Sequence, residues 1–330
     1  MTCFIYVPEK KRRTKLTAAL PGLVVKAQSG FFTVELEDGR KILSQIPGRL
    51  KVERKDANLV AAGDRVTITI NPDGTGVIES VAERSRVLSR ARPAPDRRSL
   101  QSDQEQVLVA NPDQMVSVFS IRKPRPSLRK LDRFLVVAEM NQLLAVVCVN
   151  KIDLVDPGKA QETFAPYADL GYKVIYTSAI RGDGIEELRS YLKDKISVMA
   201  GSSGVGKTSL LNAIQPGLGL RVKDVSQATD KGLHTTRYVE LIPLLIGGYV
   251  ADTPGIRALA LFDLEPGELD GYFREIAPLV ANCQFSDCTH RHEPKCAVLA
   301  AVADGLVSPE RYDSYLRIRE EHELLEESEF

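Results

Sequence analysis

Long apolar runs are missing from this sequence. No hydrophobic stretch approaches the ~18 residues that a membrane-spanning helix requires, so we expect no membrane contact. The N-terminus also lacks the basic and then apolar pattern of a secretory signal peptide. A hydrophobic fraction of 43% and a charged fraction of 27% are typical of a globular protein, and 330 residues leave room for two or three domains. We therefore expect a multidomain protein of the cytoplasm.

Cysteine is scarce and odd in number. Five cysteines in a chain expected in the cytoplasm argue against a disulfide framework. Cys148 lies in an apolar run and is predicted to be a small buried hydrophobic residue. Three others, Cys283, Cys288 and Cys296, lie close together near the C-terminus.

The net charge is zero, but the charge is unevenly distributed. Residues 1–100 carry 19 Lys and Arg against 11 Asp and Glu, so the remainder of the chain is acidic. A basic first third suggests a nucleic-acid-binding surface, although a solvated basic face would give the same count. Residues 1–18, which include Lys10-Lys11-Arg12-Arg13, are predicted to form a basic arm.

Residues 19–90 contain short β-rich runs separated by turn residues. Phe31–Leu36 and Arg65–Ile70 are examples, and Asn71-Pro72-Asp73-Gly74 is a turn signal. Such a series favours a small barrel of the OB-fold type. OB-folds often bind RNA, although a barrel used only to dock proteins is an open alternative. The Arg/Pro-rich and then polar stretch 91–106 is predicted to be a linker.

The stretch Gly201-Ser202-Ser203-Gly204-Val205-Gly206-Lys207-Thr208 fits the phosphate-binding pattern G-x-x-x-x-G-K-[ST], the P-loop. It follows a predicted strand, Ile196–Ala200, and precedes a helix start at Ser209. The glycines let backbone N–H groups turn toward a polyphosphate, and the helix dipole adds partial positive charge. Lys207 would reach the outer phosphates, and the Thr208 hydroxyl would bind Mg²⁺. An ordinary Gly/Ser turn does not explain a lysine and a hydroxyl at the two required positions.

Asn150-Lys151-Ile152-Asp153 follows the predicted strand Leu143–Val149. Asn-Lys-x-Asp at the end of a strand is the guanine-reading element of GTPases. The Asp153 carboxylate can accept hydrogen bonds from the guanine N1–H and 2-amino group, which adenine does not offer. Lys151 can pack its stem against the base, and Asn150 can bond the base edge or tie loops together. The later Ser178-Ala179 step would present a backbone N–H to the guanine O6.

Strands and helices alternate around these motifs. Helices are predicted over Leu128–Met140 and Gly182–Lys195, and strands over Gln114–Ile121, Val174–Tyr176, Tyr238–Ile246 and Tyr249–Val250. The polar stretch Pro216–His234 has little periodicity, as expected of a segment that senses the nucleotide. Thr235 or Thr236 would give a hydroxyl to Mg²⁺, Asp252 would hold Mg²⁺ through water, and the Gly255 N–H would contact the γ-phosphate.

The order of these motifs is rotated. A GTPase usually carries its P-loop first, then the switch threonine, Asp-x-x-Gly, Asn-Lys-x-Asp and Ser-Ala, whereas here the last two come first. Circular permutation is compatible with folding because the termini of a domain are often close together. We therefore predict a circularly permuted α/β GTPase domain over residues 107–262 that binds GTP or GDP with Mg²⁺.

The C-terminal cysteines have the spacing Cys283-x4-Cys288-x-His290-x5-Cys296. Three thiolates and one imidazole suit a closed tetrahedral Zn²⁺ site, and the ion would help to fold a region short of core. His292 competes with His290 for the fourth position, and a redox site is an alternative. Helices are predicted over Gly267–Val280, Ala297–Gly305 and Pro309–Leu325, so residues 263–330 are expected to form a helical zinc-binding domain.

Over nearly its whole length the chain resembles the ribosome small-subunit-dependent GTPase A (RsgA) family. The resemblance rests on the barrel, the rotated motif order, the metal spacing and the local sequences His234-Thr235-Thr236, Asp252-Thr253-Pro254-Gly255 and His292–Val298. It implies a GTPase that assists late maturation of the small ribosomal subunit, binds its rRNA and is stimulated by it. It also supports His290 as the fourth zinc ligand. We expect a monomer.

The group that orients the attacking water is not given by the usual motif. Ile256 follows Asp-x-x-Gly, where many GTPases carry a glutamine. His234 is our candidate for this role. Two other classes of function compete: an RNA-binding scaffold with a regulatory nucleotide site, and an ATP-dependent P-loop enzyme. Asn150 and Asp153 argue against the ATP-dependent enzyme.

Overall fold

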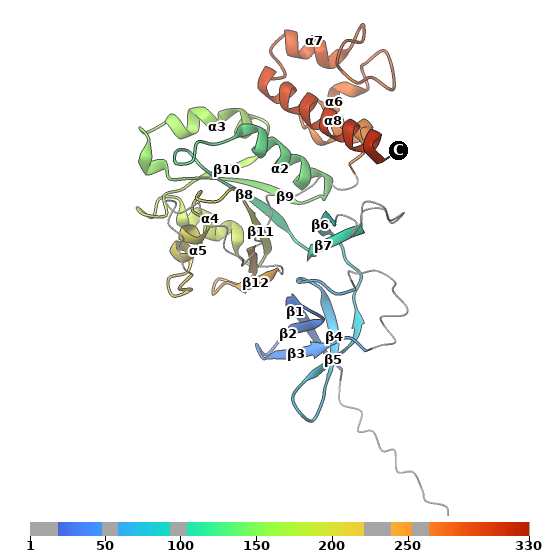
Figure 1. Cartoon of the computed structure of the whole chain (residues 1–330). Helices are drawn as coiled ribbons and strands as arrows, with labels where there is room; N and C mark the ends of the chain where they lie inside the picture. Colours follow the sequence, from blue (N-terminus) through green and yellow to red (C-terminus); the bar gives the residue numbers. More distant parts are fainter. Residues whose placement is uncertain (1–18, 48–58, 93–103, 221–238, 253–263, 330) are drawn as a thin grey trace, which may run out of the picture.

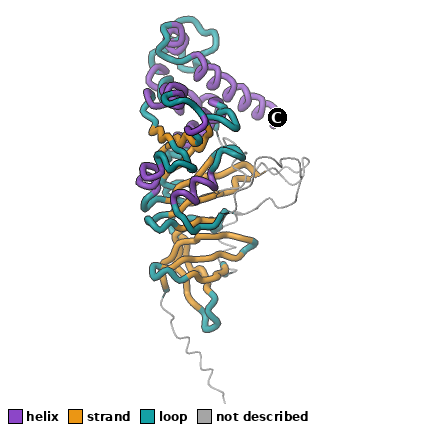
Figure 2. The backbone as a smooth tube through the Cα atoms, turned by 90° about the vertical axis from the view of Figure 1, so that its left-hand side faces the viewer, coloured by secondary structure: helices purple, strands orange, loops and turns teal. Residues whose placement is uncertain are grey.

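The computed structural model describes residues 19–47, 59–92, 104–220, 239–252 and 264–329. These residues form three units that follow one another along the molecule (Figure 1). An all-β barrel (19–81) lies at one end, an α/β central unit (114–252) in the middle, and a helical C-terminal unit (264–329) at the other end. Figure 2 shows the same order from the side. None of the helices within these ranges is both long and apolar enough to cross a membrane.

Five strands form the barrel. They are β1 (Leu20–Gln28), β2 (Phe31–Leu36), β3 (Lys41–Gln45), β4 (Arg65–Ile70) and β5 (Gly76–Val81). They pair in the order β1-β2-β3-β5-β4, and β4 pairs back with β1 to close the barrel. Side chains alternate between the two faces, so Phe32 and Val34 of β2 point inward with Val24, Ile68 and Ile78. The OB-like barrel predicted from the sequence is confirmed.

Two strands connect the barrel to the central unit. β6 (Val87–Arg92) and β7 (Gln104–Ala110) form a separate antiparallel sheet. The structure differs here from the linker predicted over 91–106, because both ends of that stretch are paired: Ala91 with Glu105, and Arg92 with Gln104. The sequence did not indicate this, since strand formation depends on packing against a partner strand more than on composition.

The central unit adds six strands to the same continuous sheet, in the order β10-β9-β8-β11-β13-β12. They are β8 (Gln114–Ser120), β9 (Leu144–Asn150), β10 (Lys173–Tyr176), β11 (Ile196–Ala200), β12 (Glu240–Pro243) and β13 (Tyr249–Asp252). All neighbouring pairs are parallel except β12 with β13. Every residue of β8 and β11 is buried, as is typical of parallel strands covered on both faces.

Helices cover both faces of this sheet. They are α2 (Leu128–Met140), α3 (Lys159–Asp169), α4 (Ile185–Leu192), α5 (Lys207–Ile214) and the short 3-10 helix η1 (Ile152–Leu154). Residues of α2 and α3 pack with Met115 and Phe119 of β8, whereas α4 and α5 pack with Val116 and Val118 of the same strand. The alternation along β8 therefore separates two hydrophobic cores, and the predicted α/β fold of the central domain is confirmed.

The barrel meets the central unit along β1 and β12. These strands share one residue pair, Lys26 with Glu240, whose side chains form an ion pair of 3.0 Å. The Tyr249 hydroxyl of β13 donates to a Glu35 carboxylate oxygen of β2 at 2.9 Å. The sheet is therefore continuous across the two units.

The C-terminal unit is helical. It contains the 3-10 helix η3 (Pro266–Tyr272) and the helices α6 (Ala277–Val280), α7 (Ala297–Ala303) and α8 (Pro309–Glu329). The single helix predicted over Gly267–Val280 is wrong. Phe273 is extended (φ −103°, ψ 107°) and ends η3, and Pro278, which has no backbone N–H, is accommodated only in the first turn of a new helix.

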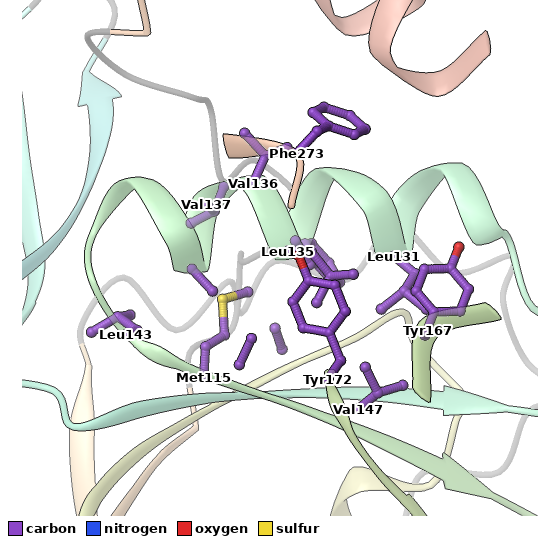
Figure 3. Close-up of a cluster of buried hydrophobic side chains, with 14 of the residues drawn as sticks. Met115, Leu131, Leu135, Val136, Val137, Leu143, Val147, Tyr167, Tyr172 and Phe273 are labelled. Atoms are coloured by element: carbon purple, nitrogen blue, oxygen red, sulfur yellow. The ribbon is translucent and has the colours of Figure 1, made fainter. Parts of the chain in front are cut away.

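Helix α2 is buried on two sides (Figure 3). Leu131 and Leu135 lie toward the sheet, near Val147, while Val136 lies on the opposite side of the helix, toward Phe273 of the C-terminal unit. Val136 and Phe273 are 1% and 0% exposed. One hydrophobic cluster therefore runs from the sheet through α2 into the C-terminal unit, and these two units are packed as one body.

A buried ion network crosses the same interface. Arg311 of α8 is 3% exposed and donates from Nη1 to Asp132 of α2 at 2.7 Å and from Nε to Glu275 at 2.6 Å. The Tyr167 hydroxyl donates to the same Asp132 oxygen at 2.7 Å. Burial and the adjacent Asp132 carboxylate raise the pKa of Tyr167, so the phenol stays protonated and can donate.

We expect Arg311→Met to destabilise the protein by about 3–5 kcal/mol, because it leaves the Asp132 and Glu275 carboxylates buried without their cation. Arg317→Met is the matched control on the same helix, since Arg317 pairs with the exposed Asp313 and its loss should change little. Urea unfolding followed by circular dichroism measures both. Equal stability of the two variants would contradict the role given to this network.

Candidate functional site

The predicted nucleotide-binding residues gather at one edge of the central sheet. The P-loop follows β11, Asn150 ends β9, Ser178 lies just after β10, and Asp252 ends β13. Because these strands are parallel neighbours, their carboxyl ends meet at the same edge, which is where α/β sheets bind ligands. Residues far apart in the sequence are thereby brought together.

The P-loop has the backbone that its glycines permit. Gly204 and Gly206 have φ of 81° and 99°, a region that L side chains rarely adopt. α5 begins at Lys207, so its free N–H groups face the loop. The Lys207 ammonium donates to the carbonyl oxygens of Gly201 at 2.7 Å and Ser202 at 3.2 Å, which places it over the loop. Thr208 and Ser209 are half-buried in the first turn of α5.

Asn150 joins two loops through its side-chain amide. Its Nδ2 donates to the Val205 carbonyl of the P-loop at 2.9 Å. Its Oδ1 accepts from the Ala179 N–H at 3.3 Å and from the Thr177 hydroxyl at 3.3 Å. Asn150 is 1% exposed, so these bonds replace water entirely. Of the two roles predicted for Asn150, the structure shows the connection between loops. The Ala179 N–H takes part in that connection by donating to Asn150 Oδ1.

Lys151 forms a second connection to the P-loop. Its ammonium donates to the Gly204 carbonyl at 2.6 Å and to the Lys123 carbonyl at 2.5 Å. Burial lowers the pKa of Lys151 and the nearby Lys123 adds to this, while the Asp153 charge opposes it. Lys151 itself has φ of 64°, which turns the chain sharply after β9. The sequence did not indicate the contact with Lys123.

Asp153 is oriented by the loop after β10. The Ser178 hydroxyl donates to Asp153 Oδ1 at 2.6 Å and accepts from the Arg181 N–H at 3.2 Å. The serine is 0% exposed, so it fixes the rotamer of the carboxylate. The two segments predicted to read guanine are therefore in direct contact with each other.

His234, Thr235 and Gly255 lie outside the described residues, and only the backbone of Asp252 is described. Their roles stay predictions.

The C-terminal cluster has the geometry of a metal site. The ligand atoms of Cys283, Cys288, His290 and Cys296 all lie within 4.8 Å of one another. Cys283 Sγ is 3.9 Å from Cys296 Sγ, and His290 Nδ1 is 3.3 Å from Cys296 Sγ. Tetrahedral zinc with its usual bond lengths separates such ligands by about 3.5–3.8 Å, so these residues could hold a metal ion of this kind.

The surroundings of the cluster distinguish the two candidate histidines. His290 is 0% exposed and its Nε2 lies 3.2 Å from the Asp270 carboxylate, which leaves Nδ1 directed at the cysteines. His292 is exposed. Asp270 was not predicted. It lies in η3, 20 residues before His290, and no sequence motif connects the two positions.

Glu293 shapes the loop that carries His290. Its carboxylate accepts hydrogen bonds from the N–H groups of Thr289 at 2.7 Å, Arg291 at 2.8 Å and His292 at 3.0 Å. Burial alone would raise the pKa of Glu293, but hydrogen bonds from the Thr289 hydroxyl and from the N–H groups of Thr289 and His292 outweigh it and hold that pKa well below its usual range. The carboxylate is therefore ionised and fixes the turn around the cluster.

Gly206→Ala tests the contact between the P-loop and Asn150. A Cβ on Gly206 would lie 2.4 Å from Asn150 Nδ2, which would break the bond to Val205. We expect a fall in guanine-nucleotide affinity of at least about tenfold, a loss of about 1.4 kcal/mol. Titration with a fluorescent guanine nucleotide measures it.

Gly182→Ala is the matched control. Gly182 also has a positive φ, 85°, but its Cβ would meet nothing within 4 Å. The control therefore carries the backbone strain without the clash. Equal loss of affinity in both variants would show that strain alone, not the Asn150 contact, is responsible.

Comparison with known proteins supports the rotated arrangement. The RsgA GTPase family model matches residues 81–262, more than half of the chain. A protein of Gemmatimonas aurantiaca named "Small ribosomal subunit biogenesis GTPase RsgA" is 42% identical over 93% of this chain and 98% of its own length. One of the same name from Bacteroides fragilis is 36% identical over 92% and 97%.

Two solved structures have the same fold. The crystal structure of YjeQ from Thermotoga maritima aligns with a TM-score of 0.75 at 40% identity, over 92% of this chain and 98% of that one. YloQ, described as a circularly permuted GTPase, aligns with a TM-score of 0.70 at 34% identity, over 94% and 97%. With its motifs in the same rotated order, this chain belongs to the RsgA GTPase family.

Proposed function

We propose that this protein hydrolyses GTP to GDP and phosphate in the biogenesis of the small ribosomal subunit. One observation carries the proposal: the side chains that read guanine, Asn150 and Asp153, are joined by direct hydrogen bonds to the P-loop and to Ser178. The printed names of the relatives supply the process, small-subunit biogenesis.

The nucleotide would lie along the carboxyl edge of the sheet. Backbone N–H groups from Gly201 to Ser209 would surround its phosphates, with Lys207 on the outer ones. Thr208 would ligate the Mg²⁺ that accompanies the nucleotide, together with Thr235, and with Asp252 through water. Mg²⁺ would neutralise phosphate charge that develops during hydrolysis. The Gly255 N–H would contact the γ-phosphate.

Guanine would be selected over adenine by Asp153. Ser178 holds one oxygen of the carboxylate, so its plane is fixed before the base arrives. Asp153 is half-buried, and a bound base would shield its carboxylate further. A shielded carboxylate left unpaired by adenine would cost several kcal/mol, on the order of a 10⁴-fold preference. This argues against an ATP-dependent enzyme.

Hydrolysis would require a group that the Asp-x-x-Gly motif does not provide, since Ile256 cannot orient water. We propose His234 for that role, completed when the small subunit binds. Residues 1–100, which carry 19 Lys and Arg against 11 Asp and Glu, would contribute to rRNA binding, and the protein would act in the cytoplasm as a monomer.

Phosphate release measured with and without purified small ribosomal subunits tests this function. We expect slow turnover alone, a rise of at least about tenfold with subunits, and no competition by excess ATP. His234→Ala should lose the stimulation and keep GTP binding. His292→Ala is the control, because that side chain is exposed and outside the metal cluster. The absence of any GTP turnover would contradict the proposal, and wild-type stimulation in His234→Ala would remove His234 from it.

We further propose that the C-terminal cluster holds one structural Zn²⁺ through Cys283, Cys288, His290 and Cys296. The support is a donor set of three thiols and one imidazole, at spacings that tetrahedral zinc favours, with a carboxylate behind the imidazole. When bound, zinc would crosslink the loop between α6 and α7.

Metal analysis of purified variants separates the two histidines. We expect about one zinc per wild-type chain, and a large loss in His290→Ala because a structural site needs all four ligands. His292→Ala should retain the metal. Elemental analysis by mass spectrometry gives the stoichiometry. Retention of zinc by His290→Ala together with its loss from His292→Ala would reverse the assignment.

A further inference from the structure

A group of cations lies before and within the first turn of α2. Residues 122–133 contain six Lys and Arg and a single acid, Asp132. That acid is 2% exposed and paired with Arg311, so it does not neutralise the surface. We call the five exposed residues among the cations the α2 patch: Arg122, Lys123, Arg125, Arg129 and Lys130.

Few of these cations are used within the protein. Among the described residues, Arg129 pairs with Asp313 at 2.9 Å, and Arg122 makes a long 3.5 Å bond to the Leu154 carbonyl. In the same described ranges, the Arg125 and Lys130 side chains have no hydrogen bond or ion pair. Their charge is therefore available to a ligand at no cost in internal contacts, and together they create a positive local field.

The α2 patch borders the phosphate end of the nucleotide site. A cleft of about 1060 Å³ lies between α2 and α8, and its walls include Arg125 and Lys130 as well as Gly201, Ser202 and Ser203 of the P-loop. A ligand held by the α2 patch would thus lie beside the nucleotide.

The backbone of the α2 patch is also fixed to the nucleotide site. The Ser120 hydroxyl donates to the Pro124 carbonyl at 2.8 Å. The Lys151 ammonium bridges the carbonyl oxygens of Lys123 and Gly204, so a single side chain connects the α2 patch to the P-loop. A displacement of the α2 patch would therefore move the P-loop through the Lys151 bridge.

We propose that the α2 patch binds the phosphate backbone of ribosomal RNA. Docking of the small subunit at this patch would then alter the GTP site. This inference rests on the proposed function and assigns one contact surface to it. The chemistry favours RNA over a protein partner. The buried core of a protein interface is enriched in apolar side chains. The exposed residues between the cations of the α2 patch are Pro124 and Ser127, and the exposed Leu324 lies across the cleft on α8. Phosphate contacts need cations and little else.

The test uses the full chain with Arg125→Gln and Lys130→Gln combined. Its affinity for purified small subunits is measured against salt concentration with a non-hydrolysable GTP analogue bound. Each lost phosphate contact lowers the slope of log affinity against log salt by about 0.7–0.9, so we expect a decrease of about 1.5. Subunit-stimulated turnover should fall severalfold, while GTP binding and unstimulated turnover stay unchanged.

The matched control removes the same charge elsewhere, with Lys159→Gln and Lys193→Gln. Lys159 begins α3 in an exposed pair with Glu162, and Lys193 follows α4. The control should retain the wild-type slope. Hydroxyl-radical footprinting of saturated complexes should show rRNA positions protected by the wild type and the control but exposed in the Arg125/Lys130 variant.

A wild-type salt slope in the Arg125/Lys130 variant would overturn the inference. Weaker binding with an unchanged rRNA footprint would also overturn it, because the partner of the α2 patch would then be a ribosomal protein. Failure of the wild-type protein to bind small subunits is a separate result. It would remove the proposed function, and this inference with it.

Discussion

The buried amide of Asn150 is the contact on which the nucleotide site depends. It holds the P-loop through Val205 and the loop after β10 through Ala179, and it leaves no room for a side chain at position 206. A buried amide that loses a partner costs about 1–3 kcal/mol, so the two loops keep a fixed spacing. One side chain thereby sets the spacing between the loop proposed to hold the phosphates and the loop proposed to hold the base.

This constraint explains why the rotated order of motifs is tolerated. The site needs the carboxyl ends of β9, β10, β11 and β13 at one edge of the sheet, and the strand order provides that whichever strand comes first. β11 lies between β8 and β13 with parallel pairing on both sides. Permutation changes the points at which the chain enters and exits the domain. It does not change which strands are adjacent in the sheet. It also allows the C-terminal unit to pack on α2, where the Arg311 network and the hydrophobic cluster join the two.

Features with local causes were predicted well. The bounds of α2 and β11 match the sequence patterns, since an amphipathic period and a buried apolar run each specify their own element. The barrel, the rotated α/β domain and the metal-ligand cluster were also predicted. What was missed depends on distant partners: the pairing of β6 with β7, the division of the helix at Phe273, Asp270 behind His290, and the second contact of Lys151. No period or motif encodes such contacts. The roles of His234, Thr235 and Gly255 stay predictions.

The position of the cysteines within the core has a consequence for the life of the protein in the cell. Cys288 and Cys296 belong to the same hydrophobic cluster as α2 and the sheet beneath it, and not to a separate domain with its own core. If the cluster holds the proposed zinc, a chain without the ion would expose thiols and apolar surface in the largest hydrophobic cluster of the described residues. Quality control by chaperones and proteases acts on such surfaces. The supply of the proposed zinc to newly made chains would then set how much of the protein accumulates, and not only the structure of its C-terminal unit.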